Sequence, residues 1–209
     1  MLANLSEPER ACLELAWQAL LAGTIPIGAV VADADGIVIR SGRNAVYGEA
    51  EPPLMSGSLL AHAEMNALVS LPVDGSYADC RLVTSMEPCQ MCTGALRMAT
   101  VGALTYLGAD PVNGTSWILE SARYVGYWPV RVTGPLEDET GRLASGLVAA
   151  YHLRRGPAGR FVAAWREERP DLLDAGVALI EAGLFELAAD QQPWEAAAPA
   201  LLAAVGYQA

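Results

Sequence analysis

The pattern of apolar and polar residues in the first forty positions predicts one helix followed by a β-hairpin. Ser6 and Glu9 have the spacing of a capping box, and the residues after them predict a helix to about Ala22. Residues 26–33 (PIGAVVAD) and 36–41 (GIVIRS) are short runs rich in Val and Ile, separated by a Gly-containing turn. Two such runs in succession are typical of a β-hairpin.

The following stretch alternates between helical and strand-like patterns. Residues 59–71 and 89–100 have helical character, whereas residues 80–86 and 101–107 read as strands, and residues 129–132 read as a weaker fifth strand. With a helix in front, the order β-β-α-β-α-β predicts an α/β protein. We expect a three-layer α/β/α sandwich around one five-stranded mixed sheet.

The composition changes after Gly134, where Ala, Leu, Glu and Arg become dominant. We expect residues 1–136 to form one domain and residues 137–209 to form a helical C-terminal extension of three or four helices. No recognisable chemistry stands out in this extension, and His152 reads as a core or surface residue without function. The simplest interpretation is that the extension packs on the core or on a partner subunit.

The charge balance limits the kinds of partner that this protein binds. Thirteen basic residues, all of them Arg, stand against 24 acidic ones, for a net charge of −11. Such a field does not attract phosphate backbones, and no Arg cluster stands out beyond Arg154-Arg155. Residues 15–32 carry no formal charge but are interrupted by polar residues, Gly and Pro, and no signal peptide is visible. We therefore expect a cytoplasmic protein with no membrane association and a small, neutral substrate rather than nucleic acid.

Two short phrases concentrate residues that bind metals. His62 lies in HAEMNAL, and Cys89 and Cys92 lie in EPCQMC. Two thiols three positions apart share one face of a helix, and a helix N-terminus lowers the pKa of a thiol. One imidazole and two thiolates suit Zn²⁺ and leave one tetrahedral position open for water. Glu64, two residues after His62, is the candidate base.

Two other interpretations use the same residues. A C-x-x-C pair is also found in redox proteins, but that function leaves His62 and Glu64 unexplained. Cys80 lies nine residues before Cys89 and would close a structural zinc site with four protein ligands. A closed site has no need for Glu64, and Cys80 reads as a buried residue of a strand.

Taken together, the two phrases match the H-x-E…P-C-x-x-C signature and resemble the zinc-dependent cytidine and deoxycytidylate deaminase superfamily. Several shorter segments are similar to the branch of guanine, cytosine and tRNA adenosine deaminases. They are residues 25–29 (IPIGA), 42–44 (GRN), 87–92 (EPCQMC) and 108–110 (GAD). Residues 65–67 (MNA) are instead like deoxycytidylate deaminases.

The resemblance implies a cytidine deaminase-like fold, one zinc ion per chain held by His62, Cys89 and Cys92, and a homodimer. It implies hydrolytic removal of an exocyclic amine, with Glu64 moving the proton. Asn44 is expected to contact the substrate. Asp110 and Trp117 are further candidates, Trp117 by stacking on a ring.

The class of substrate stays open at this point. A nucleobase or nucleoside with a guanine- or cytosine-like ring ranks first, a deoxynucleotide second and tRNA third, because a tRNA-binding protein should present a basic face. An inactive, zinc-stabilised partner subunit is the alternative from another class.

Overall fold

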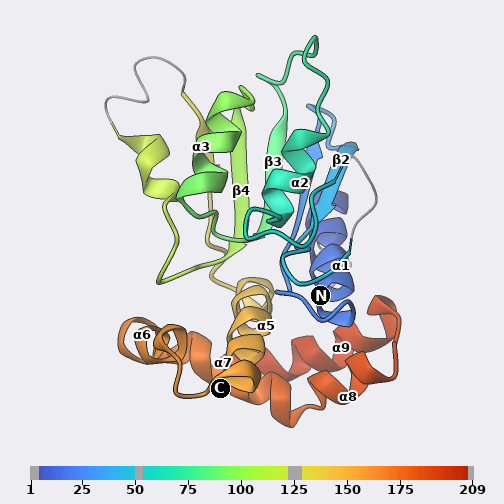
Figure 1. Cartoon of the computed structure of the whole chain (residues 1–209), viewed down its shortest axis with the longest axis vertical. Helices are drawn as coiled ribbons and strands as arrows, with labels where there is room; N and C mark the ends of the chain where they lie inside the picture. The colour runs from blue at the N-terminus through green and yellow to red at the C-terminus, as the bar shows by residue number, and fades with distance from the viewer. Residues whose placement is uncertain (1–4, 50–53, 122–128, 207–209) are drawn as a thin grey trace.

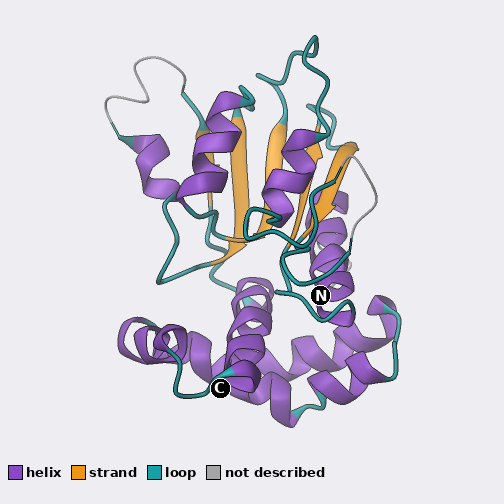
Figure 2. Cartoon of the chain, viewed as in Figure 1, coloured by secondary structure: helices purple, strands orange, loops and turns teal. Residues whose placement is uncertain are grey.

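Five strands form a single mixed sheet in a computed structural model that describes residues 5–49, 54–121 and 129–206. The strands are β1 (Gly28–Ala32), β2 (Val38–Arg43), β3 (Arg81–Met86), β4 (Ala103–Gly108) and β5 (Arg131–Thr133). Their order across the sheet is β2-β1-β3-β4-β5 (Figure 2). Strand β1 runs antiparallel to β2 and to β3, whereas β3, β4 and β5 run parallel. The predicted five-stranded mixed sheet is confirmed.

Helices cover both faces of this sheet (Figure 1). One face carries α2 (Ala63–Val69) and α3 (Gln90–Met98), and the other carries α1 (Glu7–Leu21), while α5 (Glu139–Arg155) packs against β3 and β4 and extends beyond the end of the sheet (Figure 1). Alternate strand residues enter the two cores, as strand geometry requires. Val83 packs towards α1 and α5, whereas its neighbour Leu82 packs towards α2 and α3.

Helix α1 begins where the capping box predicts. The carboxylate of Glu9 accepts hydrogen bonds from the backbone N–H and the hydroxyl of Ser6, both at 2.8 Å. Residues 15–32, which raised the question of a membrane span, comprise the end of α1, a turn and β1. In the described part of the chain, no helix has both the length and the apolar character needed to cross a membrane.

The described part of the C-terminal region contains five helices, one more than the upper expectation. They are α5, α6 (Arg160–Glu168), α7 (Pro170–Glu181), α8 (Leu184–Ala189) and α9 (Trp194–Val205). Helix α5 lies against β3 and β4 and also packs along α7. A Cβ atom at Gly176 would lie only 2.7 Å from the Cβ atom of Ala149, so this glycine allows α5 and α7 to cross closely.

Helix α9 returns to the first helix of the chain. The rings of Trp194 and Trp17 lie 6.3 Å apart, and the indole N–H of Trp17 donates a 2.9 Å hydrogen bond to the carbonyl of Gln192. One apolar cluster therefore runs from α1 through α5 into α9. The C-terminal helices of this chain pack on its own sheet domain.

Candidate metal centre and active site

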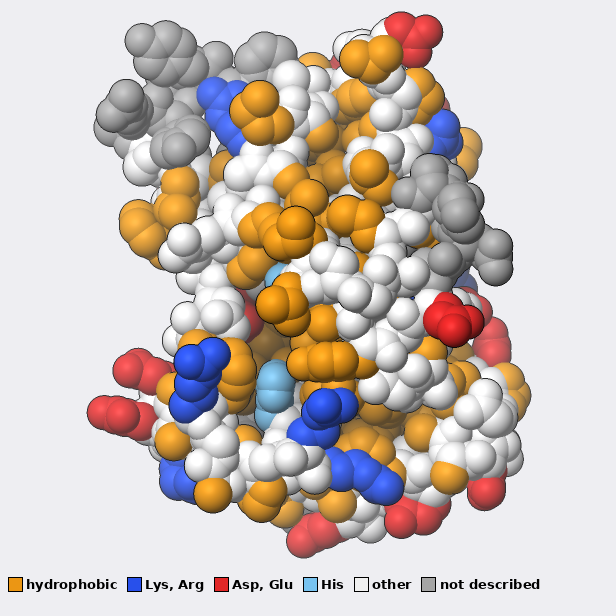
Figure 3. All heavy atoms as spheres, viewed as in Figure 1, with side chains coloured by type: hydrophobic (Ala, Val, Ile, Leu, Met, Phe, Trp, Pro, Cys, Tyr) orange, Lys and Arg blue, Asp and Glu red, His pale blue; other side chains and the backbone are white. Residues whose placement is uncertain are grey.

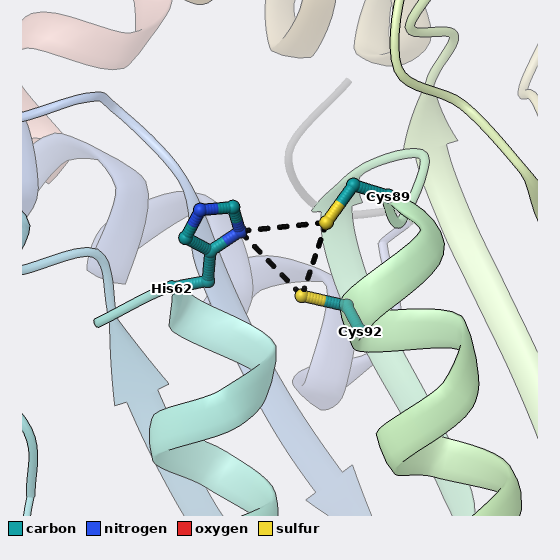
Figure 4. Close-up of side chains that lie close together, drawn as sticks. All are labelled: His62, Cys89 and Cys92. Carbon is teal, nitrogen blue, oxygen red and sulfur yellow. Dashed lines mark hydrogen bonds between the residues drawn. The ribbon is translucent and has the colours of Figure 1, made fainter. Parts of the chain in front are cut away.

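The candidate metal ligands lie where two helices begin beside the sheet. His62 is the N-cap residue of α2, and Cys89 is the N-cap residue of α3. Cys92 follows within the first turn of α3. Helix α3 starts just beyond the end of β3, so Cys89 and Cys92 lie close to the start of α2. The three side chains point towards one another (Figure 4).

The spacing of the three ligand atoms fits a zinc ion. The two Sγ atoms lie 3.7 Å apart, and the Nδ1 atom of His62 lies 3.7 Å from the Sγ atom of Cys89 and 3.6 Å from that of Cys92. A tetrahedral ion with Zn–S near 2.3 Å and Zn–N near 2.0 Å requires an S–S separation of about 3.8 Å and an S–N separation of about 3.5 Å. The side chains are therefore arranged as zinc ligands.

The charge of the cluster also favours a cation. The hydrogen bond between the two thiol groups lowers the pKa of Cys89 to about 4, which favours the thiolate form of this residue. The same hydrogen bond, together with burial, raises the pKa of Cys92. A hydrogen bond to Cys89 raises the pKa of His62. Binding a metal would replace these shared protons, because metal ligands must be deprotonated.

Cys80 does not belong to this cluster. Among the described residues, His62, Cys89 and Cys92 form the group of metal-binding side chains at this place, without a fourth. Cys80 immediately precedes β3, whereas Cys89 follows the other end of the strand, and six strand residues span about 20 Å. The closed four-ligand site is therefore not formed, although Cys80 and Cys89 are near in sequence.

Glu64 lies beside the ligands without joining them. It is the second residue of α2, its side chain is almost completely buried, and it lines the same cavity as His62 and Cys89. Burial raises the pKa of its carboxyl group, because removal from water disfavours the charged form. A carboxyl group with a raised pKa is suited to accept and return a proton near neutral pH.

The cavity has a volume of about 570 Å³ and opens to the surface. Figure 3 shows a hollow between the sheet domain and the C-terminal helices, where histidine is visible with basic side chains beside it. Ile27, Met86 and Val148 give it apolar walls near the metal ligands. The volume lies within the range of pockets that bind small molecules.

The structure brings two of the three expected substrate-binding residues to this cavity. Asn44 and Asp110 line it, and Asn44 is almost fully buried. The side-chain oxygen of Asn44 accepts hydrogen bonds from the hydroxyl of Thr24 at 2.7 Å and from the backbone N–H of Val46 at 3.1 Å. This fixes the carboxamide and leaves its NH₂ group available to a ligand.

Asp110 also forms hydrogen bonds within its own loop. One of its carboxylate oxygens accepts hydrogen bonds from the backbone N–H groups of Val112 and Asn113, both at 2.9 Å. The loop after β4 is therefore held in shape by this carboxylate. Asp110 is a wall residue whose oxygens are already engaged.

Trp117 does not line the cavity. It lies on the short helix η2 (Ser116–Glu120), and 64% of its surface is exposed. Its neighbour Leu119 is buried against the sheet instead. The expectation that Trp117 stacks on the substrate does not fit the cavity of this chain.

Sequence reasoning missed the wall that the C-terminal region contributes. Tyr151, His152 and Arg155 of α5 line the cavity, together with Phe161 at the start of α6. The rings of His152 and Phe161 are stacked, with centroids 4.9 Å apart. Positions 148, 151, 152 and 155 follow helical spacing, which is the signal that could have identified this face. His152, first interpreted as a residue without function, is part of the cavity wall.

An α/β/α sandwich with a His-Cys-Cys cluster at two helix N-termini has the architecture of a zinc-dependent deaminase. The family model described as the cytidine and deoxycytidylate deaminase zinc-binding region matches residues 4–107. Through this part of its sequence, the chain belongs to the zinc-dependent cytidine deaminase-like family.

Three relatives illustrate the range of similarity. A tRNA(Ile)-lysidine synthase of Deinococcus radiodurans is 36% identical over 138 residues, which are 63% of this chain and 22% of that protein. A guanine deaminase of Bacillus subtilis is 40% identical over 84 residues, which are 39% of this chain and 49% of that protein. The solved structure of a guanine deaminase from Nitrosomonas europaea is 27% identical with a TM-score of 0.51, and the match covers 70% of this chain and 85% of that one. The chain thus spans about half or less of the length of the Deinococcus and Bacillus proteins.

Proposed function

We propose that this protein is a zinc-dependent hydrolytic deaminase that removes the exocyclic amine of a guanine- or cytosine-like ring. The observation that carries the proposal is the cluster of three ligand atoms with tetrahedral spacing, next to a cavity that also contains Glu64. His62, Cys89 and Cys92 would hold the ion and leave one corner for solvent. Membership of the deaminase family supports the same reaction.

The ion, when bound, supplies Lewis-acid chemistry that lowers the pKa of a coordinated water. Glu64 accepts the proton of the attacking water. It then delivers that proton to the ring nitrogen next to the reacting carbon. Glu64 next takes the proton of the hydroxyl group now on the reacting carbon and gives it to the amine, so that ammonia leaves as the C–N bond breaks and the ring keeps a carbonyl oxygen. Glu64 is ionised at the start and at the end of the cycle, so one buried carboxyl group is enough for all the proton transfers.

The remaining residues bind and orient the ring. Asn44 donates a hydrogen bond through its NH₂ group, because its oxygen is already held by Thr24 and Val46. Ile27 and Met86 provide apolar contacts to the faces of the ring. An inactive, zinc-stabilised subunit would have no need for a buried glutamate in the cavity, which is why the active enzyme is the preferred proposal.

The proposed function is tested with Glu64→Gln. We expect this variant to retain zinc and to lose ammonia release by about 100-fold or more, in keeping with the usual contribution of general acid–base catalysis. Zinc is measured by atomic absorption, and ammonia release is screened over free bases, nucleosides and nucleotides. Turnover by Glu64→Gln at the rate of the unmodified protein would refute the mechanism.

Two cysteine variants provide a matched control for the metal site. Cys89→Ser removes a ligand and should lower the zinc content, whereas Cys80→Ser should leave the zinc content unchanged, because Cys80 lies outside the cluster. Loss of zinc from Cys80→Ser would favour the closed structural site.

A homodimer is part of the proposal. Leu60, just before α2, and Met98, the last residue of α3, expose apolar side chains, which supports a partner on the face of the sheet that these two helices cover. Analytical ultracentrifugation at micromolar concentration tests it, and a monomer would refute this part.

A further inference from the structure

The cavity extends well beyond the space that one ring needs. At about 30 Å³ per water molecule, its volume of about 570 Å³ equals roughly 19 waters, whereas a guanine ring system has only about eleven heavy atoms. Besides the metal ligands His62 and Cys89, its wall includes Arg155, Arg160 and Phe161 of the C-terminal region. Tyr47 also lines it and lies under the guanidinium of Arg155, and we call this part of the wall the outer end.

Helix α5 connects the two ends of the cavity. Val148 packs with Met86 beside the metal ligands, and Arg155 lies seven residues further along the same face. Two turns of helix advance about 10 Å. This separation is comparable to the distance from the exocyclic amine of a nucleotide to its phosphate.

Arg155 is held in place without an anionic partner. Its guanidinium donates a 3.1 Å hydrogen bond to the hydroxyl of Tyr151 and lies 4.6 Å from the ring centroid of Tyr47. Among the described residues, no carboxylate forms an ion pair with Arg155 or with Arg160. Arg43 differs, because its guanidinium donates to two backbone carbonyls. A guanidinium has five N–H donors, so Arg155 retains several for a ligand.

One part of the cavity wall is aromatic. The stacked rings of His152 and Phe161 form part of its wall, and burial lowers the pKa of His152. The carboxylates of Glu64 and Glu87 belong to the zinc end, where Glu87 accepts hydrogen bonds from Ser116. The carboxylate of Asp110 also lines the cavity and interacts with His152. The positive charge of the lining comes from Arg155 and Arg160.

We propose that Arg155 and Arg160 bind the phosphate of a nucleoside monophosphate whose ring lies at the zinc end of the cavity. This inference rests on the proposed function for the position of the ring. It changes the ranking from the sequence, which placed free bases and nucleosides first because the net charge is negative. Two arginines in one cavity create a local site that the overall charge does not reveal.

The test compares the nucleoside and the 5′-monophosphate of the same ring, using the zinc-loaded full chain. We expect the monophosphate to have a kcat/KM about 10- to 100-fold higher, as charge-assisted hydrogen bonds to a phosphate predict. The double variant Arg155→Gln/Arg160→Gln should reduce this ratio to near one. Arg154→Gln is the matched control, because the neighbouring guanidinium lies over Phe185, outside the cavity, and should leave the ratio as it was.

A binding measurement separates this inference from the proposed function. Zinc-loaded Glu64→Gln is titrated calorimetrically with both ligands, with and without the two arginine substitutions. Tighter binding of the monophosphate that the substitutions abolish supports the phosphate site even if no ring is deaminated. Equal binding of nucleoside and monophosphate overturns the phosphate site. So does an unchanged preference for the monophosphate in both the Arg160→Gln single variant and the double variant, provided that circular dichroism shows both variants to be folded. Turnover of a single-stranded oligonucleotide but of no mononucleotide would also overturn it, because the phosphate would then come from a strand.

Discussion

Replacing Trp194 by Ala tests whether the C-terminal helices are an integral part of the folded core. The Trp194 side chain is only 6% exposed, and its ring contacts that of Trp17 on the first helix. Removing a buried Trp side chain costs about 3–5 kcal/mol of unfolding free energy. Because the Trp194 side chain keeps a small exposed fraction, we expect the lower end, about 3 kcal/mol.

The expected change is large enough to measure directly. For a protein of this size, about 3 kcal/mol corresponds to a fall in Tm of about 6–12 °C. Urea unfolding is followed by far-UV circular dichroism, and zinc release is followed with a chromogenic chelator at one fixed zinc concentration. Both signals should change together, because one apolar cluster joins α1, α5 and α9.

Trp117→Ala provides the control for this prediction. It removes the same side chain from a site that is 64% exposed, so the unfolding free energy should change by no more than about 0.5 kcal/mol. A loss below about 1 kcal/mol in Trp194→Ala would refute the reasoning. Separate transitions for zinc release and helix unfolding would show that the two parts of the chain fold independently.

Two further predictions concern the cavity wall. Asn44→Ala leaves the buried hydroxyl of Thr24 and the N–H of Val46 without their acceptor. The free energy of unfolding, measured in urea, should therefore fall by about 2 kcal/mol or more. A fall of less than about 1 kcal/mol would contradict the assigned hydrogen bonds. Burial lowers the pKa of His152 below its ordinary value of 6.5. The unfolded chain therefore binds a proton at His152 more tightly than the folded chain does. The stability that His152 contributes above pH 6.5 is lost as the pH falls. His152→Phe should therefore lose less unfolding free energy between about pH 7.5 and 5.5 than the unmodified protein, and equal losses would contradict this.

The metal site could be found from the sequence because its residues are local. His62 and Glu64 are two positions apart, Cys89 and Cys92 are three apart, and each pair is placed by the first turn of one helix. The strand pattern was equally readable, because alternation and turn residues act over a few positions. These features depend on short-range geometry, which the order of residues specifies directly.

Tertiary structure alone decided which distant residues share the cavity. Helix α5 is buried on nearly every side between residues 140 and 151, so the helical spacing of Tyr151, His152 and Arg155 marks one face without showing that this face lines the cavity. Trp117 looked like a stacking residue, but the packing of Leu119 turned the indole outwards. Local sequence specifies the chemistry of each segment, and the packing of helices on the sheet determines which segments meet.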